Sequence, residues 1–319
     1  MYKTMPDMEP EFALFENRPG GGDALLRLLP RITRARNWRL YTAEGKRLVD
    51  LWQYGGRAVL GHNPPALLRT IKNSGEQGLF APLPHAAEGR LYKALSLLLP
   101  RRRFRLYENE ESLRGVLRAA GTGFVPVVWR PWLEPAAEGR DAPVSPDLTP
   151  PVEPAPPESA PPLEPALLVP VLLVPVLPLP FPGAPAVLAL DPSLDGLFPL
   201  SPVLSPLALT AAARSVYTLL SSPERGSPRF PKVDRALQHS PVWKRRGIYL
   251  FYRPMTVADK GQENAVSEDP AAADYAGLFR RFLDGGFLLP PEQAEPAILP
   301  GELSPGEEAK LAALISAAG

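Results

Sequence analysis

The sequence predicts an α/β protein with a reduced, mostly parallel central sheet and a small α+β domain made from both chain ends. Three observations carry this prediction. Residues 101–129 follow the order strand, loop, helix, strand, which opens a parallel sheet with a right-handed crossover. Two uncharged apolar runs, near 171–174 and at 186–190, are typical of strands covered on both faces. A hairpin at 40–52 and a strand at 246–253 flank these runs.

The order of these elements also predicts the domain limits. Residues 1–85 are expected to form an N-terminal arm and part of the small domain. Residues 86–222 are expected to form the reduced large α/β domain, interrupted by a proline-rich insertion at 134–164. Residues 223–319 would complete the small α+β domain.

The bulk composition narrows the classes of function. With a formal net charge of +1, the chain offers no general attraction to nucleic acid or to an anionic membrane. It has no cysteine, which excludes disulfides and thiolate sites. His62, His85 and His239 lie far apart in sequence, so no metal site is predicted. The polar, acidic first residues lack the apolar core of a secretory signal, so a cytoplasmic location is expected.

The N-terminal third is predicted to contain an arm, a hairpin and three helices. The arm covers residues 1–22, and a short helix at 23–29 is stopped by a proline. Four arginines follow, which form a solvated face or, alternatively, contact an anion or an acidic partner: Arg31, Arg34, Arg36 and Arg39. The hairpin turns at 43–46. Apolar residues at helical spacing predict helices at 65–75 and 85–99.

The middle of the chain begins with a predicted strand at 101–107, a cap at 108–112, a helix at 113–120 and a strand at 124–129. Proline is the compositional outlier, with 43 residues. Most of the excess follows this strand. Residues 134–164 contain almost no large apolar side chain and cannot offset their ordering entropy, so a polyproline-like loop or linker is expected, alternatively a ligand for a proline-reading domain.

Residues 165–190 carry no charge and are numerous enough to raise the question of a membrane span. Repeated prolines argue against a spanning helix, because each one removes a backbone donor and clashes with the preceding turn. We expect instead two short buried strands, at 167–169 or 171–174 and at 186–190, separated by a turn at Pro182-Gly183.

The C-terminal third alternates helices and strands. The final helix should start with a capping box at Ser304, with Glu307 as its partner. The remaining elements follow from apolar periodicity and Gly/Pro breaks: helices at 207–220, 233–237, 274–283 and 304–318, strands at 246–253 and 287–290, and a polar loop at 261–269.

Two N-terminal motifs resemble class III aminotransferases, the fold-type I pyridoxal-phosphate (PLP) enzymes. Residues Glu44-Gly45-Lys46-Arg47-Leu48-Val49-Asp50-Leu51 match the family's "dGkrylDl" hairpin, and Leu60-Gly61-His62-Asn63-Pro64 match its "lGHxhP" turn. The C-terminal third is also similar, most of all to glutamate-1-semialdehyde aminomutases, in Gly247 to Phe251, Gly286 to Pro291 and Glu295 to Leu299. The resemblance implies a fold-type I architecture, PLP as the family's cofactor and a homodimer. It covers both ends of the chain well and the middle poorly.

The resemblance also implies a lysine that forms a Schiff base with PLP, and the sequence lacks it. The family places this lysine before the helix matched here by 207–220. No lysine occurs between Lys93 and Lys232, and Lys232 comes after that helix. Arginine cannot replace it, because its guanidinium stays protonated. We therefore expect no catalytic residue and no bound PLP.

The other cofactor contacts implied by the family are altered too. Its phosphate-binding "SG(S/T)EA" turn corresponds to Asn109-Glu110-Glu111-Ser112-Leu113, where the new negative charge opposes a phosphate. Asn109 and Ser112 are interpreted as a helix cap. Trp129 or Trp132 lies near the family's ring-stacking position, alternatively in core packing. Asp191 ends an apolar strand, as the pyridine partner does in the family, and is alternatively a cap. The candidate cleft residues are Asn109, Ser112, Trp132 and Asp191.

These observations favour a degenerate aminotransferase-like protein, a pseudoenzyme with a binding or structural role toward a small molecule or a protein. The alternative is an enzyme of another kind, or a residual PLP-dependent aminotransferase or aminomutase. Such an enzyme would reuse the cleft through Asn109, Glu111, Ser112, Trp132 or Asp191. A third hypothesis is membrane association through residues 165–190.

Overall fold

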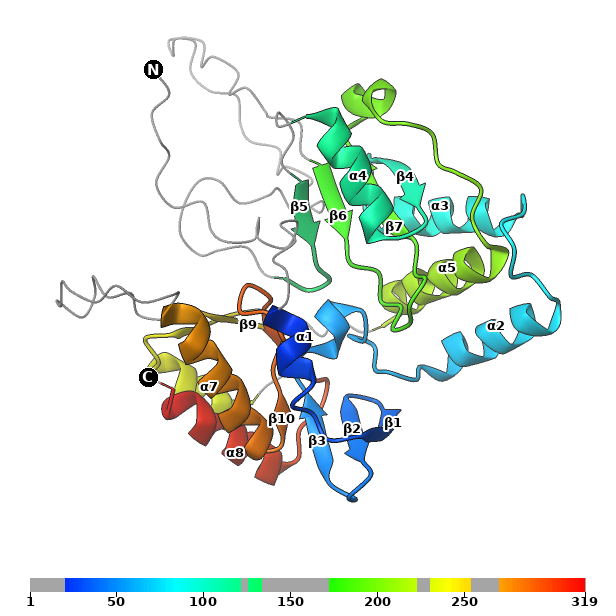
Figure 1. Cartoon of the computed structure of the whole chain (residues 1–319). Helices are drawn as coiled ribbons and strands as arrows, with labels where there is room; N and C mark the ends of the chain where they lie inside the picture. The colour runs from blue at the N-terminus through cyan, green and yellow to red at the C-terminus, as the bar shows by residue number, and fades with distance from the viewer. Residues whose placement is uncertain (1–20, 122–125, 134–171, 223–229, 254–269, 319) are drawn as a thin grey trace, which may run out of the picture.

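The computed structural model describes residues 21–121, 126–133, 172–222, 230–253 and 270–318 (Figure 1). Four sequence predictions lie outside these residues: the arm before residue 21, the proline-rich insertion at 134–164, the alternative strand position at 167–169 and the polar loop at 261–269.

The central sheet has four strands in the order β4-β7-β6-β5. They are β4 (Arg103–Tyr107), β5 (Pro126–Trp129), β6 (Leu172–Pro175) and β7 (Ala186–Leu190). β5 and β6 are parallel, and β7 is antiparallel to both of its neighbours. Three of these four strands therefore share one direction. β7 runs the other way because the segment from β6 to β7 is shorter than a parallel crossover usually requires.

Helices cover both faces of this sheet (Figure 1). On one face lie α3 (Ala87–Leu98) and α5 (Pro206–Leu220), and on the other lies α4 (Glu110–Ala120). Because side chains alternate along a strand, Val187 and Ala189 pack toward α3 and α5, and Leu188 packs toward α4. The run at 186–190 is thus buried on both faces, as its apolar sequence predicts.

A further helix, α2 (Pro65–Glu76), packs against α5 and contributes Leu67 to the same apolar cluster. Residues 65–76 therefore accompany the central sheet, although they precede the domain limit expected at residue 85.

The two chain ends meet in a second unit. One sheet contains β1 (Ile32–Arg36), β2 (Arg39–Thr42), β3 (Arg47–Asp50) and β10 (Phe287–Leu288), with β10 parallel to β3. A smaller sheet has the order β11-β9-β8: β11 (Ala297–Ile298), β9 (Tyr249–Tyr252) and β8 (Trp243–Arg246). The helices of this unit are α1 (Gly21–Leu26), α6 (Pro231–Gln238), α7 (Pro270–Asp284) and α8 (Pro305–Ser316). One apolar cluster joins both ends, which confirms an α+β part built from them.

Several strands differ from the sequence prediction. The strand expected at 246–253 contains β9, but β9 is the second strand of a hairpin whose first strand, β8, was not predicted; Arg246 pairs with Tyr249 at its turn. The short strand β11 was not predicted either. Gly247 adopts φ +60°, which suits the first position of a two-residue hairpin loop. β1 was not predicted, because its sequence does not alternate between apolar and polar residues. Only Ile32 and Ala35 are partly buried, and the other three side chains are exposed.

Within the described residues, no helix has the length and apolarity needed to cross a bilayer. The described part of the uncharged run forms β6, β7 and a turn at Gly183, where φ is +83°. The sequence predicted two buried strands in this run, and β6 and β7 confirm that prediction.

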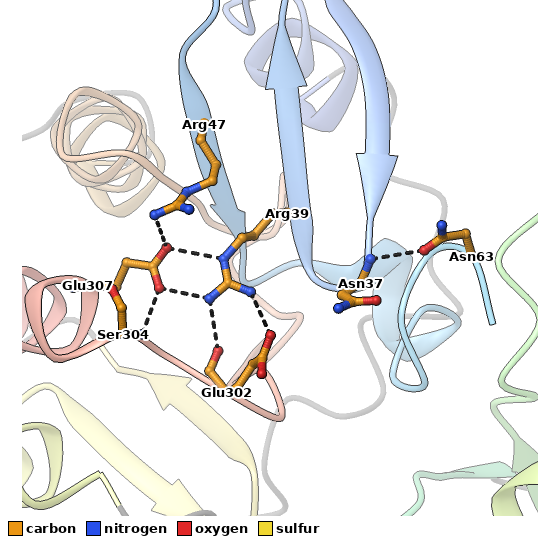
Figure 2. Close-up of polar contacts among 7 residues, drawn as sticks. All are labelled: Asn37, Arg39, Arg47, Asn63, Glu302, Ser304 and Glu307. Atoms are coloured by element: carbon orange, nitrogen blue, oxygen red, sulfur yellow. Dashed lines mark hydrogen bonds and ion pairs between the residues drawn. The ribbon is translucent and has the colours of Figure 1, made fainter. Parts of the chain in front are cut away.

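A polar network ties α8 to the N-terminal hairpin (Figure 2). Ser304 and Glu307 form the predicted capping box at the start of α8. The Glu307 carboxylate also accepts hydrogen bonds from Arg39 Nε (3.1 Å) and Nη2 (2.8 Å), and it lies 3.0 Å from Arg47 Nη2. Burial alone would raise the pKa of Glu307, but the hydrogen bonds from Arg39 and Ser304 outweigh it and lower the pKa to about 2.

This network predicts a loss of stability in acid. The folded-state pKa of Glu307 is below its usual value, so the stabilisation is complete above about pH 5 and is lost as the pH falls toward 2. We expect Glu307 to contribute roughly 2–3 kcal/mol to the difference in unfolding free energy between these limits. Urea unfolding of the wild type and Glu307→Gln across this range measures it. The unfolding free energies of the wild type and Glu307→Gln should become equal at low pH. Glu76→Gln replaces an exposed carboxylate on α2 and serves as the control. A constant gap between wild type and Glu307→Gln would contradict the assignment.

Candidate functional site

Three strand ends and one strand start meet at one edge of the central sheet. β4 ends at Tyr107, which pairs with Ala186 at the start of β7. β5 and β6 end together, where Trp129 pairs with Pro175. α4 starts just beyond this edge, at Glu110. Ligands of open α/β sheets bind outside the carboxyl ends of the strands, so a functional site is expected at this edge.

A loop from the second unit covers this edge, and Asp50 holds the loop. Asp50 is only 1% exposed. Its Oδ1 accepts backbone N–H groups from Trp52 (2.9 Å) and Gln53 (2.8 Å), and its Oδ2 lies 2.7 Å from His62 Nε2. Gln53 and Tyr54 have positive φ angles of 48° and 52°, a conformation that costs side-chain-bearing residues free energy. The Asp50 carboxylate therefore stabilises a strained loop.

The Gly61-His62-Asn63 turn fixes His62 beside Asp50. The His62 N–H donates to Asn37 O (2.7 Å), and Asn63 Oδ1 accepts the Asn37 N–H (3.0 Å; Figure 2). The two motifs that carry the family resemblance thus have a structural role in this chain: they shape the loop over the sheet edge.

Gly61→Ala should lower stability more than a matched glycine substitution. Gly61 has φ +93°, and a Cβ there would lie 3.1 Å from the Asn37 Cα, which is backbone and cannot rotate away. We expect a loss of about 2 kcal/mol in unfolding free energy. Gly78 has φ +71° with open space around it, so Gly78→Ala carries only the conformational cost, about 1 kcal/mol. Equal losses in urea unfolding would show that the close approach to Asn37 is unimportant.

Between the loop and the sheet edge lies a cavity of about 200 Å³. Its walls come from the loop after β3, from the edge of the central sheet and from Glu295 near β11. The charged and aromatic lining residues are Trp52, Tyr54, Arg57, Glu110, Arg114, Arg130 and Glu295, and the rest is mainly valine, proline and other apolar side chains. The cavity is therefore built from both units of the chain.

One side of the cavity is closed by ion pairs at the start of α4. Arg57 Nη2 donates to Glu110 Oε1, and the other Glu110 oxygen lies 3.6 Å from Arg114 Nη2. Asn109 caps the helix, because its Oδ1 accepts the Ser112 N–H at 2.9 Å and the Ser112 hydroxyl at 3.2 Å. The chain's own carboxylate and amide oxygens thus already occupy the anion-attracting end of this helix.

The other side of the cavity contains Arg130 and Glu295. Arg130 is 6% exposed, and its Nη1 donates to Gly55 O at 2.6 Å. Gly56 permits this approach, since a Cβ there would lie 3.3 Å from Arg130 Nη1. Glu295 accepts a hydrogen bond from Trp52 Nε1 at 2.9 Å. Burial raises the pKa of the Glu295 carboxyl, against the lowering effects of Arg130 and the Trp52 bond.

The four residues predicted from the sequence do not line this cavity. Asn109 and Ser112 form the helix cap, which was their structural interpretation. Trp132 packs with Val59, Tyr249 and neighbouring apolar residues. Asp191 caps a 3-10 helix, η3 (Pro192–Leu197), by accepting the Ser193 N–H at 3.0 Å. It follows the far end of β7, roughly 16 Å along the strand from Ala186.

The residues that do line the cavity were missed by sequence reasoning. Arg130 follows a predicted strand, as a ligand-binding residue of an α/β sheet should, and that position was the available signal. Glu295 begins a stretch that resembles the family, but its place in the cavity beside Trp52 could not be predicted, because their contact joins positions far apart in the sequence. Of the described residues, no three His, Asp or Glu side chains gather as they would around a metal ion.

The described lysines all lie outside the cavity. Each of them is exposed to solvent: Lys46, Lys72, Lys93, Lys232, Lys244 and Lys310. Lys232 donates to Pro305 O through Nζ at 3.3 Å, in the second unit. The lining residues therefore do not fit PLP: they provide no amine for a Schiff base, and Glu110 at the start of α4 adds a carboxylate that repels a phosphate dianion.

Comparison with known proteins shows the fold. The chain resembles the ω-transaminase from Sphaerobacter thermophilus (TM-score 0.54, 13% identity, 96% of this chain and 98% of that chain). It also resembles ornithine δ-aminotransferase from Plasmodium falciparum (TM-score 0.58, 9% identity, 90% and 92%). Acetylornithine aminotransferase from Elizabethkingia anophelis is a third neighbour (TM-score 0.57, 9% identity, 94% and 99%). These are class III PLP-dependent aminotransferases, and the chain has their fold-type I architecture.

Sequence comparison adds relatives but no activity. No protein-family model matches the chain. A protein of Treponema pallidum (strain Nichols), described as uncharacterized, is 27% identical over 312 residues, which cover 86% of this chain and 91% of that protein. An uncharacterized protein of Borreliella burgdorferi is 45% identical over 56 residues, 18% of this chain and 21% of that protein.

Proposed function

We propose that this chain, which has the aminotransferase fold, performs no PLP chemistry and acts by non-covalent binding in the cleft between its two units. One observation carries the proposal: the six lysines of the described residues are all exposed, and none lines the cavity. A Schiff-base lysine must reach the coenzyme inside the cleft, where desolvation lowers its pKa and frees the amine to react.

The α4 end of the cavity supports the same proposal. A coenzyme phosphate is a dianion that needs free N–H donors or cations. Here Asn109 and Glu110 take the helix donors and the charge of Arg57. Displacing Glu110 would leave that carboxylate without its arginine partners, so phosphate binding at this place costs free energy twice.

The chemistry of the lining favours binding over another kind of catalysis. Among the described lining residues there is no Ser, Thr, Cys, His or Lys, so hydroxyl nucleophiles of Ser and Thr, thiol and amine nucleophiles and an imidazole base are missing. What remains is a set of arginines, two carboxylates and two aromatic rings beside an apolar wall. Such a mixed, concave lining is typical of a small-molecule binding site.

Reaction with PLP tests the proposal, including Lys3 and Lys260, which lie outside the described residues. The purified chain is mixed with equimolar PLP, reduced with borohydride and mapped by peptide mass spectrometry. We expect only scattered, substoichiometric labelling of exposed lysines and no amino-group transfer from a panel of amines to pyruvate. Stoichiometric labelling of one lysine, or measurable transfer, would refute the proposal.

A further inference from the structure

We propose that the outer edge of β1 binds an extended acidic segment of a partner protein, whose carboxylates at alternate positions pair with Arg34 and Arg36. This surface lies outside the cleft, since no residue of β1 lines the cavity. The inference therefore goes beyond the proposed function and does not depend on it.

β1 is an open edge of its sheet. The order β1-β2-β3-β10 leaves one side of β1 without a neighbouring strand among the described residues, and Figure 1 shows β1 at the margin of the sheet. An edge strand presents N–H and C=O groups to any chain that can pair with them. Several kinds of domain bind an extended peptide in this way, as an added strand.

The register shows which backbone groups of β1 point outward. Arg36 pairs with Arg39 across a two-residue loop, so these two residues exchange both backbone hydrogen bonds. The N–H and C=O groups of the adjacent residues, Ala35 and Asn37, therefore point away from β2. The turn at 61–63 already bonds to those of Asn37, whereas no described residue bonds to those of Ala35.

The side chains along this edge are basic. Arg31, Arg34 and Arg36 are exposed, and no carboxylate of the described residues lies within ion-pairing distance of them. Arg34 packs over the Tyr41 ring, with its Cζ 4.3 Å from the ring centroid. Stacking engages the flat face of the guanidinium and leaves its N–H groups available to a carboxylate. Charge complementarity therefore favours an acidic partner.

The neighbouring strands show that this face of the sheet binds carboxylates. Arg34 lies opposite Tyr41, which lies opposite Arg47, so the three side chains share one face. Arg47 on β3 and Arg39 on β2 both pair with Glu307 of α8 (Figure 2). α8 thus supplies a carboxylate to the arginines of β2 and β3, and the described residues supply none to those of β1.

The spacing of the two arginines defines the partner. Arg34 and Arg36 are two residues apart on one strand, so their side chains leave the same face about 7 Å apart. An extended partner has the same repeat, so its carboxylates at alternate positions would each face one arginine. Neither a phosphodiester backbone nor a layer of lipid headgroups has the strand-spaced N–H and C=O groups that would pair with Ala35. These features favour a peptide.

NMR titration of the nitrogen-15-labelled full chain tests the inference. The probes are three seven-residue peptides with blocked ends. The first alternates threonine and glutamate, the second has the same composition with its glutamates consecutive, and the third has glutamine in place of glutamate. We expect the first to bind about threefold more tightly than the second and about threefold to tenfold more tightly than the third, with shift changes centred on β1. Equal binding of the first and third peptides would overturn the inference.

A double variant tests the charge. Arg34→Gln combined with Arg36→Gln should weaken binding of the alternating peptide about threefold to tenfold. Arg69→Gln combined with Arg90→Gln is the matched control, because it removes two exposed arginines on α2 and α3 and changes the net charge equally. The control should bind as the wild type does. Equal weakening in both double variants would show a general effect of net charge and overturn the inference.

A proline variant tests the strand edge. Ala35→Pro removes the outward N–H and keeps all the arginines, and proline is tolerated on the open side of an edge strand. Binding of the alternating peptide should weaken at least about threefold, and unchanged binding would overturn strand addition.

Hydrogen exchange of the wild type decides the same point if Ala35→Pro does not fold. The Ala35 amide should gain protection when the alternating peptide binds, and unchanged exchange would overturn the inference. A single-stranded RNA oligomer that binds β1 more tightly than the alternating peptide would also overturn it, since the surface would then recognise phosphates.

Discussion

Asp50→Ala should unfold the loop over the cleft and reduce the unfolding free energy by about 3 kcal/mol or more. The substitution removes the acceptor of two backbone N–H groups, those of Trp52 and Gln53, and the partner of His62. Gln53 is fully buried, so no water replaces the lost bond. The positive φ angles of Gln53 and Tyr54 would then lose the contact that maintains them.

Two variants define the cause of this loss. Asp50→Asn retains an oxygen for both N–H groups and should lose only about 1–2 kcal/mol. Asp284→Ala removes an exposed carboxylate at the end of α7 and should be near neutral. Chemical denaturation measures all three, and hydrogen exchange of the Trp52 and Gln53 amides reports the loop directly. Unchanged protection of these amides in Asp50→Ala would contradict the role given to Asp50.

Tyr249→Ala should cost about 3–5 kcal/mol and weaken the connection between the two units. Tyr249 is fully buried on β9, and its hydroxyl donates to Pro131 O at 2.9 Å. Its ring packs in the cluster that joins Val59 and Ile298 to Trp132, and it lies beneath Arg130. Truncation therefore removes core packing, a buried hydrogen bond and a neighbour of the cavity in one step.

A comparison of two truncations distinguishes a loss of contact between the two units from a loss of core packing within one unit. Tyr249→Phe loses only the hydroxyl and should cost about 1–2 kcal/mol. Phe279→Ala empties a fully buried site on α7 within the cluster of the second unit, and it should cost as much as Tyr249→Ala without affecting the cleft. Differential scanning calorimetry should then show separate transitions for Tyr249→Ala only. A single transition for both variants would show that Tyr249 does not couple the units.

The fold could be predicted from the sequence wherever local pattern decides. The hairpin at 39–50, the buried strand at 186–190 and the cap at Ser304 each follow from turn residues, apolar runs or a capping box, and the structure confirms them. The strand β8 before the one expected at 246–253 was missed, because its residues Lys244, Arg245 and Arg246 give no apolar strand pattern and a single Gly247 is a weak turn signal.

The site could be predicted less well than the fold. Asp191 ends a buried strand as expected, but β7 runs opposite to its neighbours and carries that residue away from the carboxyl edge. Arg130, Trp52 and Glu295 come together only through tertiary packing of distant segments. The absence of a lysine between Lys93 and Lys232 was visible in the sequence, since it depends on residue identity and not on geometry.

Whether any lysine of this chain can form a Schiff base with PLP is decided by a crystal structure determined from protein saturated with PLP. We expect electron density for the unchanged Arg57–Glu110 pair and no density that joins the coenzyme to any side chain. Continuous density from PLP to a lysine nitrogen would contradict this expectation.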